Sequence, residues 1–161
     1  MRCDTKQFAE MYEEIYVDLY RFSLGMMKNV PDAEDAVSEA VLAAYENIRK
    51  LRDKEAFRSW IFTILANVCR RKLKQAKKRG ASETGEEKAL ERHEGANPDY
   101  GLAVDVRNAF SRLSEEEREI VSLSVFGGYN SREIASMMKL NANTVRSKRS
   151  RALEKMECVL K

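Results

Sequence analysis

The sequence predicts an all-α protein with two small helical domains joined by a flexible linker, the C-terminal domain containing a helix-turn-helix. The composition favours helices over strands and loops, because 43% of the 161 residues are hydrophobic and 34% are charged, with only 7 Gly and 2 Pro. Hydrophobic residues recur at intervals of three and four along most of the chain. Small, acidic and turn-forming residues replace this pattern between the two halves. We therefore expect domains at residues 1–79 and 102–161, with the linker at residues 80–101.

The charge pattern and the lack of long apolar runs narrow the class of protein. A net charge of +3 is weak evidence for nucleic-acid binding, whereas the segregation of acid and base along the chain is more informative. No uncharged run approaches the roughly 18–20 apolar residues of a membrane span. The first residues, MRCDTKQF, lack the apolar segment of a signal peptide. We expect a soluble, cytoplasmic protein without membrane insertion.

The cysteine and histidine residues of this sequence do not form a catalytic or metal-binding pattern. Cys3, Cys69 and Cys158 are widely spaced and odd in number, so buried or incidental thiols are a better interpretation than a disulfide framework or a zinc site. His93 is the single histidine, and its polar surroundings indicate a surface residue. The chain also lacks a glycine-rich phosphate loop and a cluster of metal ligands. We expect no catalytic residues, no metal and no cofactor.

Three helices are predicted in the N-terminal domain. Residues 5–27 form the first, whose core face is Phe8, Met11, Tyr12, Ile15, Leu19, Phe22 and Met26. After a break at residues 29–31, residues 32–51 form the second, with Tyr45 among its inward residues. This helix is acidic at its start and basic at its end, and on the residues alone dipole complementation is the better explanation of its acidic half. Residues 57–79 form the third helix.

The third predicted helix begins apolar and ends basic. Its basic end has no acid among Arg70, Arg71, Lys72, Lys74, Lys77, Lys78 and Arg79. A cluster of this kind after an aromatic residue is typical of a phosphate-binding surface. A solvated helix end explains the residues equally well, so both interpretations stay open at this point.

The C-terminal domain is predicted to hold four helices, the last two of them forming the helix-turn-helix. Capping boxes at Ser114–Glu117 and Asn130–Glu133 mark two helix starts. Lys139, Leu140 and Asn141 form the turn, and Asn141 caps the last helix. That helix projects Asn143, Thr144, Arg146, Ser147, Ser150 and Arg151 outward. Amides and guanidinium groups pair with base edges, while hydroxyls and other cations hold phosphates. We favour DNA binding over an ordinary helical hairpin with a basic solvated face.

Taken together, these segments resemble the sigma-70 superfamily of bacterial transcription initiation factors, in its extracytoplasmic-function (ECF) group, over nearly the whole chain. The stretch DAEDAVSEAVLAAYENI is similar to the polymerase-binding helix of the group. FRSWIFTILANVCRRKLK is similar to the helix that reads the minus-ten promoter element. LSEEEREIVSLSVFGGYNSREIASMMKLNANTVRSKRSRAL is similar to the domain that reads the minus-thirty-five element. The order of the three blocks and the length of the linker fit the small ECF group.

The resemblance implies a factor that binds core RNA polymerase, recognises both promoter elements and promotes DNA melting. Its implied partners are core polymerase, promoter DNA as duplex and as melted strand, and an anti-sigma factor. The positions that match polymerase docking are Asp32, Glu34, Asp35, Ser38, Glu39 and Leu42. Those that match minus-ten binding are Arg52, Lys54, Arg58, Trp60, Asn67, Arg70, Arg71 and Lys74, and residues 52–56 match a loop that captures a flipped base. Those that match minus-thirty-five binding are Asn143, Thr144, Arg146, Ser147, Lys148, Ser150 and Arg151.

Five positions depart from the usual pattern of the group. Ser38 replaces a common glutamine and Val41 a common aromatic residue, changes that alter polymerase affinity without abolishing docking. Arg71 replaces a frequent aspartate. Lys139 stands where glycine is usual, so the turn must hold a side chain at a strained backbone angle. Arg149 replaces a leucine and either reaches a phosphate or loosens the packing beneath the recognition helix.

The main alternative is a stand-alone regulator that uses the same helix-turn-helix without polymerase. Such a protein binds duplex DNA by itself, often as a dimer. It has no need for the acidic helix or for the aromatic-to-basic helix. An enzyme is disfavoured by the missing catalytic constellation, and a purely structural helical protein leaves the basic helix ends unexplained.

Overall fold

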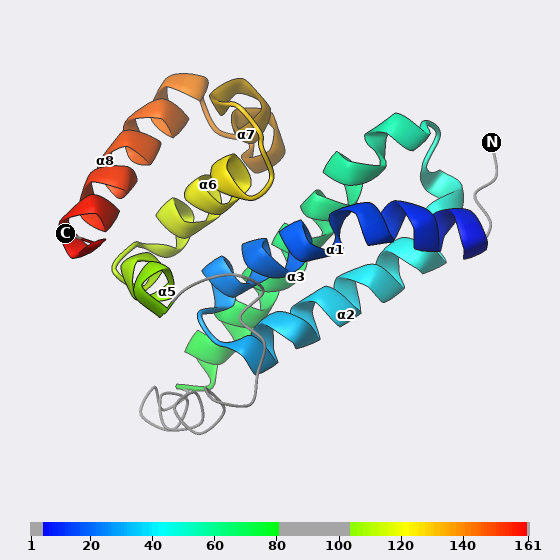
Figure 1. Cartoon of the computed structure of the whole chain (residues 1–161), viewed down its shortest axis with the longest axis horizontal. Coiled ribbons are helices and arrows are strands. Elements are labelled where there is room, and N and C mark those ends of the chain that lie inside the picture. Colours follow the sequence, from blue (N-terminus) through cyan, green and yellow to red (C-terminus); the bar gives the residue numbers. More distant parts are fainter. Residues whose placement is uncertain (1–4, 81–103, 161) are drawn as a thin grey trace.

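The computed structural model describes residues 5–80 and 104–160, and every regular element in these ranges is a helix (Figure 1). The N-terminal group contains α1 (Thr5–Met27), α2 (Val30–Glu46) and α3 (Phe57–Lys78), with short 3-10 helices at Ile48–Lys50 and Lys54–Ala56. The C-terminal group contains α5 (Val104–Ser111), α6 (Glu115–Val125), α7 (Ser131–Met138) and α8 (Ala142–Leu160). The all-α prediction is confirmed. Cys3, His93 and the expected linker, apart from Gly80, lie outside the described residues, and the predicted domain limits stay a prediction.

The N-terminal helices lie side by side around an apolar core (Figure 1). Phe8, Ile15, Leu19 and Phe22 are all buried, as the helical periodicity of α1 predicts. Phe22 packs edge-to-face against Phe62 of α3, with ring centroids 5.7 Å apart. The sequence pattern missed this contact, because Phe62 is not part of the apolar face predicted for residues 57–79, which consists of Phe57, Trp60, Ile61, Ile64, Leu65, Val68 and Leu73.

The second helix begins and ends earlier than predicted. The Asn29 side chain accepts a hydrogen bond from the Asp32 amide at 2.9 Å, so the helix starts at Val30 with Pro31 in its first turn. At its other end the Asn47 side chain donates to the Ala43 carbonyl at 2.8 Å, and the chain changes to a 3-10 turn. The residues after Glu46 therefore do not continue the α-helix to position 51.

Tyr45 was predicted to face the core, and this prediction is wrong. The residue lies at the edge of the bundle, with its hydroxyl 2.7 Å from the Thr5 hydroxyl and its ring against Phe8. The hydroxyl keeps a polar partner there while the ring covers an apolar neighbour. The neighbouring residue Ala44, which was also predicted to face inward, is fully buried.

The C-terminal helices are held by the caps that the sequence predicts. Ser114 and Glu117 form a complete capping box at the start of α6, and Asn130 and Glu133 form another at the start of α7. Asn141 accepts a hydrogen bond from the Asn143 amide at 2.8 Å and so caps α8. These local contacts set the beginnings of the helices that form the helix-turn-helix.

Lys139 occupies a left-handed conformation in the turn, with φ 58° and ψ 45°. The Leu140 amide donates to the Ala135 carbonyl at 2.8 Å and closes the end of α7 around it. The strained angle predicted for this lysine is confirmed, and a side chain in this region is disfavoured.

We expect Lys139→Gly to stabilise the protein by about 1 kcal/mol, because glycine adopts the left-handed region without the Cβ penalty. The measurement is the free energy of unfolding from urea denaturation. Ser136→Gly is the matched control, since Ser136 is an exposed residue inside α7 and glycine there weakens the helix. Destabilisation by both substitutions would contradict the strain assigned to the turn.

The two groups of helices share a buried core. Ile120 and Leu123 of α6 belong to the same buried cluster as Phe22 and Phe62. Figure 1 shows α6 beside the C-terminal half of α1. A second, smaller cluster around Phe110 and Val121 joins α5, α6 and α8. The sequence predicted two helical domains joined by a linker, and the structure shows that part of the C-terminal apolar surface is buried against the N-terminal helices.

Candidate nucleic-acid and protein interfaces

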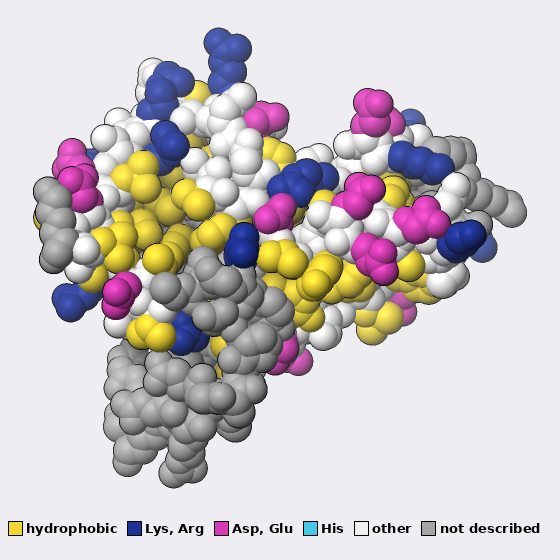
Figure 2. Space-filling view, in the orientation of Figure 1, with side chains coloured by type: hydrophobic (Ala, Val, Ile, Leu, Met, Phe, Trp, Pro, Cys, Tyr) yellow, Lys and Arg dark blue, Asp and Glu magenta, His cyan; other side chains and the backbone are white. Residues whose placement is uncertain are grey.

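The outer face of α8 carries the residues predicted for the minus-thirty-five element. Val145 and Ala152 are fully buried and orient the helix against the rest of the C-terminal group. Exposed on the opposite side are Asn143, Arg146, Ser147, Ser150 and Arg151, with Thr144 and Lys148 half-buried at its margins. Basic side chains stand out over the N-terminal end of this helix (Figure 2). The arrangement is that of a recognition helix with its polar face available to a groove.

Contacts within the C-terminal group hold several of these side chains. The Asn143 side-chain oxygen accepts a hydrogen bond from the Arg146 guanidinium, which organises the start of the face. Lys148 pairs with Glu116 of α6 at 2.5 Å. Arg149 donates to the Ser124 hydroxyl at 2.8 Å. Arg149 therefore links α8 to α6. This contact differs from both roles expected from the sequence, which were to reach a phosphate or to loosen the packing beneath the recognition helix.

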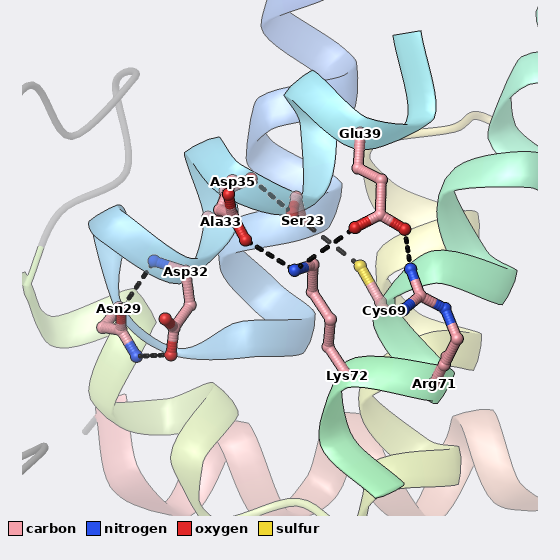
Figure 3. A network of polar contacts seen from close by, with 9 residues as sticks. All are labelled: Ser23, Asn29, Asp32, Ala33, Asp35, Glu39, Cys69, Arg71 and Lys72. Carbon is pink, nitrogen blue, oxygen red and sulfur yellow. Dashed lines mark hydrogen bonds and ion pairs between the residues drawn. The ribbon is translucent and has the colours of Figure 1, made fainter. Parts of the chain in front are cut away.

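The acidic face of α2 lies against the basic end of α3, as Figure 3 shows. The Lys72 ammonium is 2.5 Å from Asp35 and 3.5 Å from Glu39, and the Arg71 guanidinium forms an ion pair with Glu39. Asp32 instead accepts from the Asn29 side chain at 2.8 Å and belongs to the cap of α2. Residues predicted for polymerase docking and for DNA binding are thus paired with each other within the described part of the chain.

The remaining predicted docking positions stay on the outside of α2. Ser38 and Leu42 are exposed, Leu42 to 58%, and Glu34 is half-buried. Leu42 is therefore an exposed apolar side chain on the same helix as Asp35 and Glu39.

The loop predicted to capture a flipped base is partly helical. The Asp53 side chain accepts from the Glu55 amide at 3.0 Å and caps the 3-10 helix Lys54–Ala56. Arg52 and Lys54 are exposed beside it, and Trp60 is half-buried near the Phe57 ring. Cations and an aromatic ring are therefore close to one end of α3, which is the combination that single-stranded DNA requires.

Two of the predicted minus-ten residues, Arg58 and Arg70, contact the C-terminal group. Arg70 donates three hydrogen bonds of 2.9–3.2 Å to the Glu119 carboxylate of α6 and one of 2.7 Å to the Asn67 side chain. Arg58 donates to the Gly127 carbonyl at 3.0 Å and to Asp18 at 3.1 Å. Lys74 is exposed on the same helix. The predicted minus-ten residues therefore lie on different sides of α3. Arg71 faces α2, whereas Arg58 and Arg70 face the C-terminal group.

Glu119 and Arg118 are the polar residues that the sequence analysis missed. Both are buried, Glu119 to 2% exposure, although they stand in the charged run SEEERE. Burial raises the pKa of Glu119, while Arg70 opposes that shift. For Glu117 burial also acts to raise the pKa, but the Ser114 amide and Lys155 outweigh it and the pKa is lowered. In the sequence, the burial of Arg118 and Glu119 is signalled only by the apolar residue Ile120 that follows them. The capping box at Ser114–Glu117 makes the same stretch look like an ordinary solvated helix start.

Cys69 supports no reactive role. It is fully buried beside the Ser23 hydroxyl, and burial raises the pKa of its thiol to about 12. A protonated buried thiol is inert. Among the described residues there is no group of three or more potential metal ligands, and no helix is both long and apolar enough to cross a membrane.

Comparison with known proteins identifies the class. Residues 11–79 match the family model of sigma-70 region 2, and residues 103–156 match that of sigma-70 region 4. The fold and these two matches define a helical transcription initiation factor. The chain belongs to the sigma-70 family, and its relatives show it to be a sigma factor of the ECF group.

Two curated relatives and one solved structure illustrate the similarity. The RNA polymerase sigma factor SigV of Bacillus subtilis strain 168 is 28% identical over 143 residues, covering 89% of this chain and 84% of that protein. The ECF RNA polymerase sigma factor SigM of Mycobacterium tuberculosis strain H37Rv is 26% identical over 157 residues, covering 98% and 79%. The sigma factor RpoE of Bartonella quintana, solved in complex with the anti-sigma factor NepR, has a similar fold, with a TM-score of 0.73, 22% identity and coverage of 97% and 98%.

Proposed function

We propose that this sigma factor divides its work among three surfaces. The outer face of α8 reads the minus-thirty-five element as duplex. The cations and Trp60 along α3, with the loop at residues 52–56, hold the opened minus-ten strand. The acidic face of α2, with Leu42, docks on core polymerase. Its role is recognition and strand capture rather than catalysis, because the synthesis of RNA belongs to the polymerase.

The observation that carries the proposal is the presence of three chemistries on three different helices of one scaffold. A row of amide, hydroxyl and guanidinium groups lies on α8, a cationic and aromatic strip on α3, and carboxylates beside an exposed leucine on α2. A stand-alone regulator needs only the first of these. The matched regions 2 and 4 support the assignment of the other two.

The proposal also places the protein in the cytoplasm, where bacterial polymerase and promoters are found. An anti-sigma factor is a further proposed partner, supported by the complex of RpoE with NepR, whose sigma factor has a similar fold. Such a partner would cover one or more of the three surfaces.

The test is run-off transcription from a library of genomic promoters, with core polymerase in the presence and absence of the protein. We expect protein-dependent initiation at promoters that share a two-part motif. Binding of duplex DNA by the protein alone, without any initiation, would instead support the stand-alone regulator. Initiation that requires only one of the two promoter elements would contradict the division of labour between α8 and α3.

A further inference from the structure

The cations in the first three turns of α8 are not equivalent. They are Arg146, Lys148, Arg149 and Arg151. Lys148 pairs with Glu116 and Arg149 donates to Ser124, so both are held by side chains of α6. Arg146 and Arg151 are exposed and have no ion pair within the described part of the chain. The arginines that remain available to a DNA groove are therefore these two.

Arg146 is held by a neighbour on its own helix. The side-chain oxygen of Asn143, three residues earlier, accepts a hydrogen bond from Nη2 of Arg146. Residues at this spacing lie one above the other on a helix surface. The backbone amide of Asn143 donates to the Asn141 side chain at 2.8 Å, so the cap of α8 fixes the backbone on which the pair stands. The end of α8 that first meets a groove thus carries a guanidinium group whose direction is already set.

The contact also determines which hydrogen-bonding groups the pair presents. A guanidinium group only donates, so the Asn143 amide must turn its oxygen toward Arg146 and its NH2 group away from it. One of the five N–H donors of Arg146 is used, and the others stay available. The pair therefore offers donors alone. In the major groove guanine presents two acceptors, N7 and O6, whereas adenine places a donor beside N7 and cytosine presents a donor.

The same arrangement occurs on α3. Nη1 of Arg70 donates to the side-chain oxygen of Asn67 at 2.7 Å, again across three residues. Asparagine has a low helix propensity, so neither residue is explained as a helix former. The two helices proposed to contact DNA each place an asparagine one turn before an arginine and bond the two side chains together. This recurrence supports a role of the asparagine toward the arginine.

We propose that Asn143 is a positioning residue that holds Arg146 for reading a guanine of the minus-thirty-five duplex. Arg146 makes the bidentate contact with the base, and Asn143 restricts the arginine before DNA arrives. Less side-chain freedom is then lost when the complex forms. The inference rests on the proposed role of α8, and it adds the base that the helix reads and the residue that prepares the contact.

A double-mutant cycle tests whether Asn143 acts through Arg146. The full-length variants are Asn143→Ala, Arg146→Ala and the combination of both. The measurement is the dissociation constant for the minus-thirty-five duplex and for duplexes in which each base pair is replaced in turn. We expect Asn143→Ala to lower affinity about two- to tenfold, the effect of freeing one long side chain. In the Arg146→Ala background the same substitution should change affinity less than about twofold, because no guanidinium is left to position.

The base preference gives a readout that a loss of stability does not move. Asn143→Ala and Arg146→Ala should both relax the preference for guanine at one and the same promoter position. Asn143→Asp keeps the acceptor oxygen and removes the NH2 group, so it should retain the guanine preference even where its negative charge lowers overall affinity.

Asn108→Ala is the matched control for these substitutions. Asn108 is an exposed asparagine of α5 in the same helical group, and its side chain contacts no arginine within the described residues. This variant should leave both affinity and base preference unchanged. Alanine is a better helix former than asparagine, and the cap of α8 uses the backbone amide of residue 143, so Asn143→Ala should unfold at a urea concentration no lower than that of the wild type.

The outcomes separate the inference from the assignment on which it rests. If Asn143→Ala and Arg146→Ala have additive effects and relax different promoter positions, Asn143 reads a base of its own and the positioning role is overturned, while the role of α8 stands. If the position relaxed by Arg146→Ala is not a guanine, the assigned base is wrong. If Arg146→Ala alters neither affinity nor base preference, the role of α8 and the inference both fail.

Discussion

Replacing Arg146 by alanine should weaken binding of promoter duplex by about 10- to 100-fold, in line with the roughly 1–3 kcal/mol of a base-reading arginine. Arg146 is exposed near the start of α8, and its guanidinium is oriented by the Asn143 side chain. Loss of the guanidinium removes both the base contact and its charge. The measurement is the dissociation constant of the full-length protein for a minus-thirty-five duplex that the transcription assay identifies.

Two further measurements distinguish a contact of Arg146 with a base from a contact with a phosphate. A side chain that reads a base loses discrimination at one promoter position when it is removed, whereas one that holds a phosphate lowers the slope of log affinity against log salt by about 1. Arg112→Ala is the matched control, because Arg112 is an exposed arginine of the same helical group just after α5. An equal loss of affinity in both variants would indicate general charge attraction and contradict a recognition helix.

Removing Asp35 and Glu39 together should lower affinity for core polymerase by at least about 10-fold, because close charge pairs at protein interfaces contribute on the order of 1.5 kcal/mol or more. The substitutions are Asp35→Ala and Glu39→Ala. The side chains are 69% and 42% exposed, so they remain reachable by a partner although Lys72 and Arg71 contact them. Fluorescence-detected binding of labelled protein to core polymerase gives the dissociation constant.

The paired cations supply the control for this variant. Arg71→Met and Lys72→Met break the same ion pairs from the α3 side and leave both carboxylates in place. Exposed ion pairs of this kind contribute little to folding stability, so both double variants should unfold at similar denaturant concentrations. The methionine variant should keep its polymerase affinity. Equal loss in the two variants would show that the pairs themselves, rather than the carboxylates, matter for docking.

Local sequence signals determined where most helices begin and which faces they bury. The capping boxes at Ser114 and Asn130, and the periodic apolar residues of α1, act within one or two helical turns, so the sequence expresses them directly. The left-handed Lys139 was anticipated from the family resemblance, because glycine is usual at this position of the group. The helical period gave a wrong prediction at two places. Tyr45 lies at the edge of the bundle, where its hydroxyl has a polar partner, and α2 ends early because the Asn47 side chain caps it.

Only the tertiary structure decided the partners of the charged residues. Arg70 lies 49 positions from Glu119, and Arg58 lies 69 positions from Gly127, so no local pattern could link them. The sequence placed the cations of α3 on one helix and the acids of α2 on another, but which acid each cation meets depends on how the helices pack. Burial of Glu119 follows from the same packing, because an acidic helix start is normally solvated unless another element covers it. The sequence thus determined the protein family and the apolar and charged faces of the helices. The packing of α6 on α1 determined which of those faces are covered.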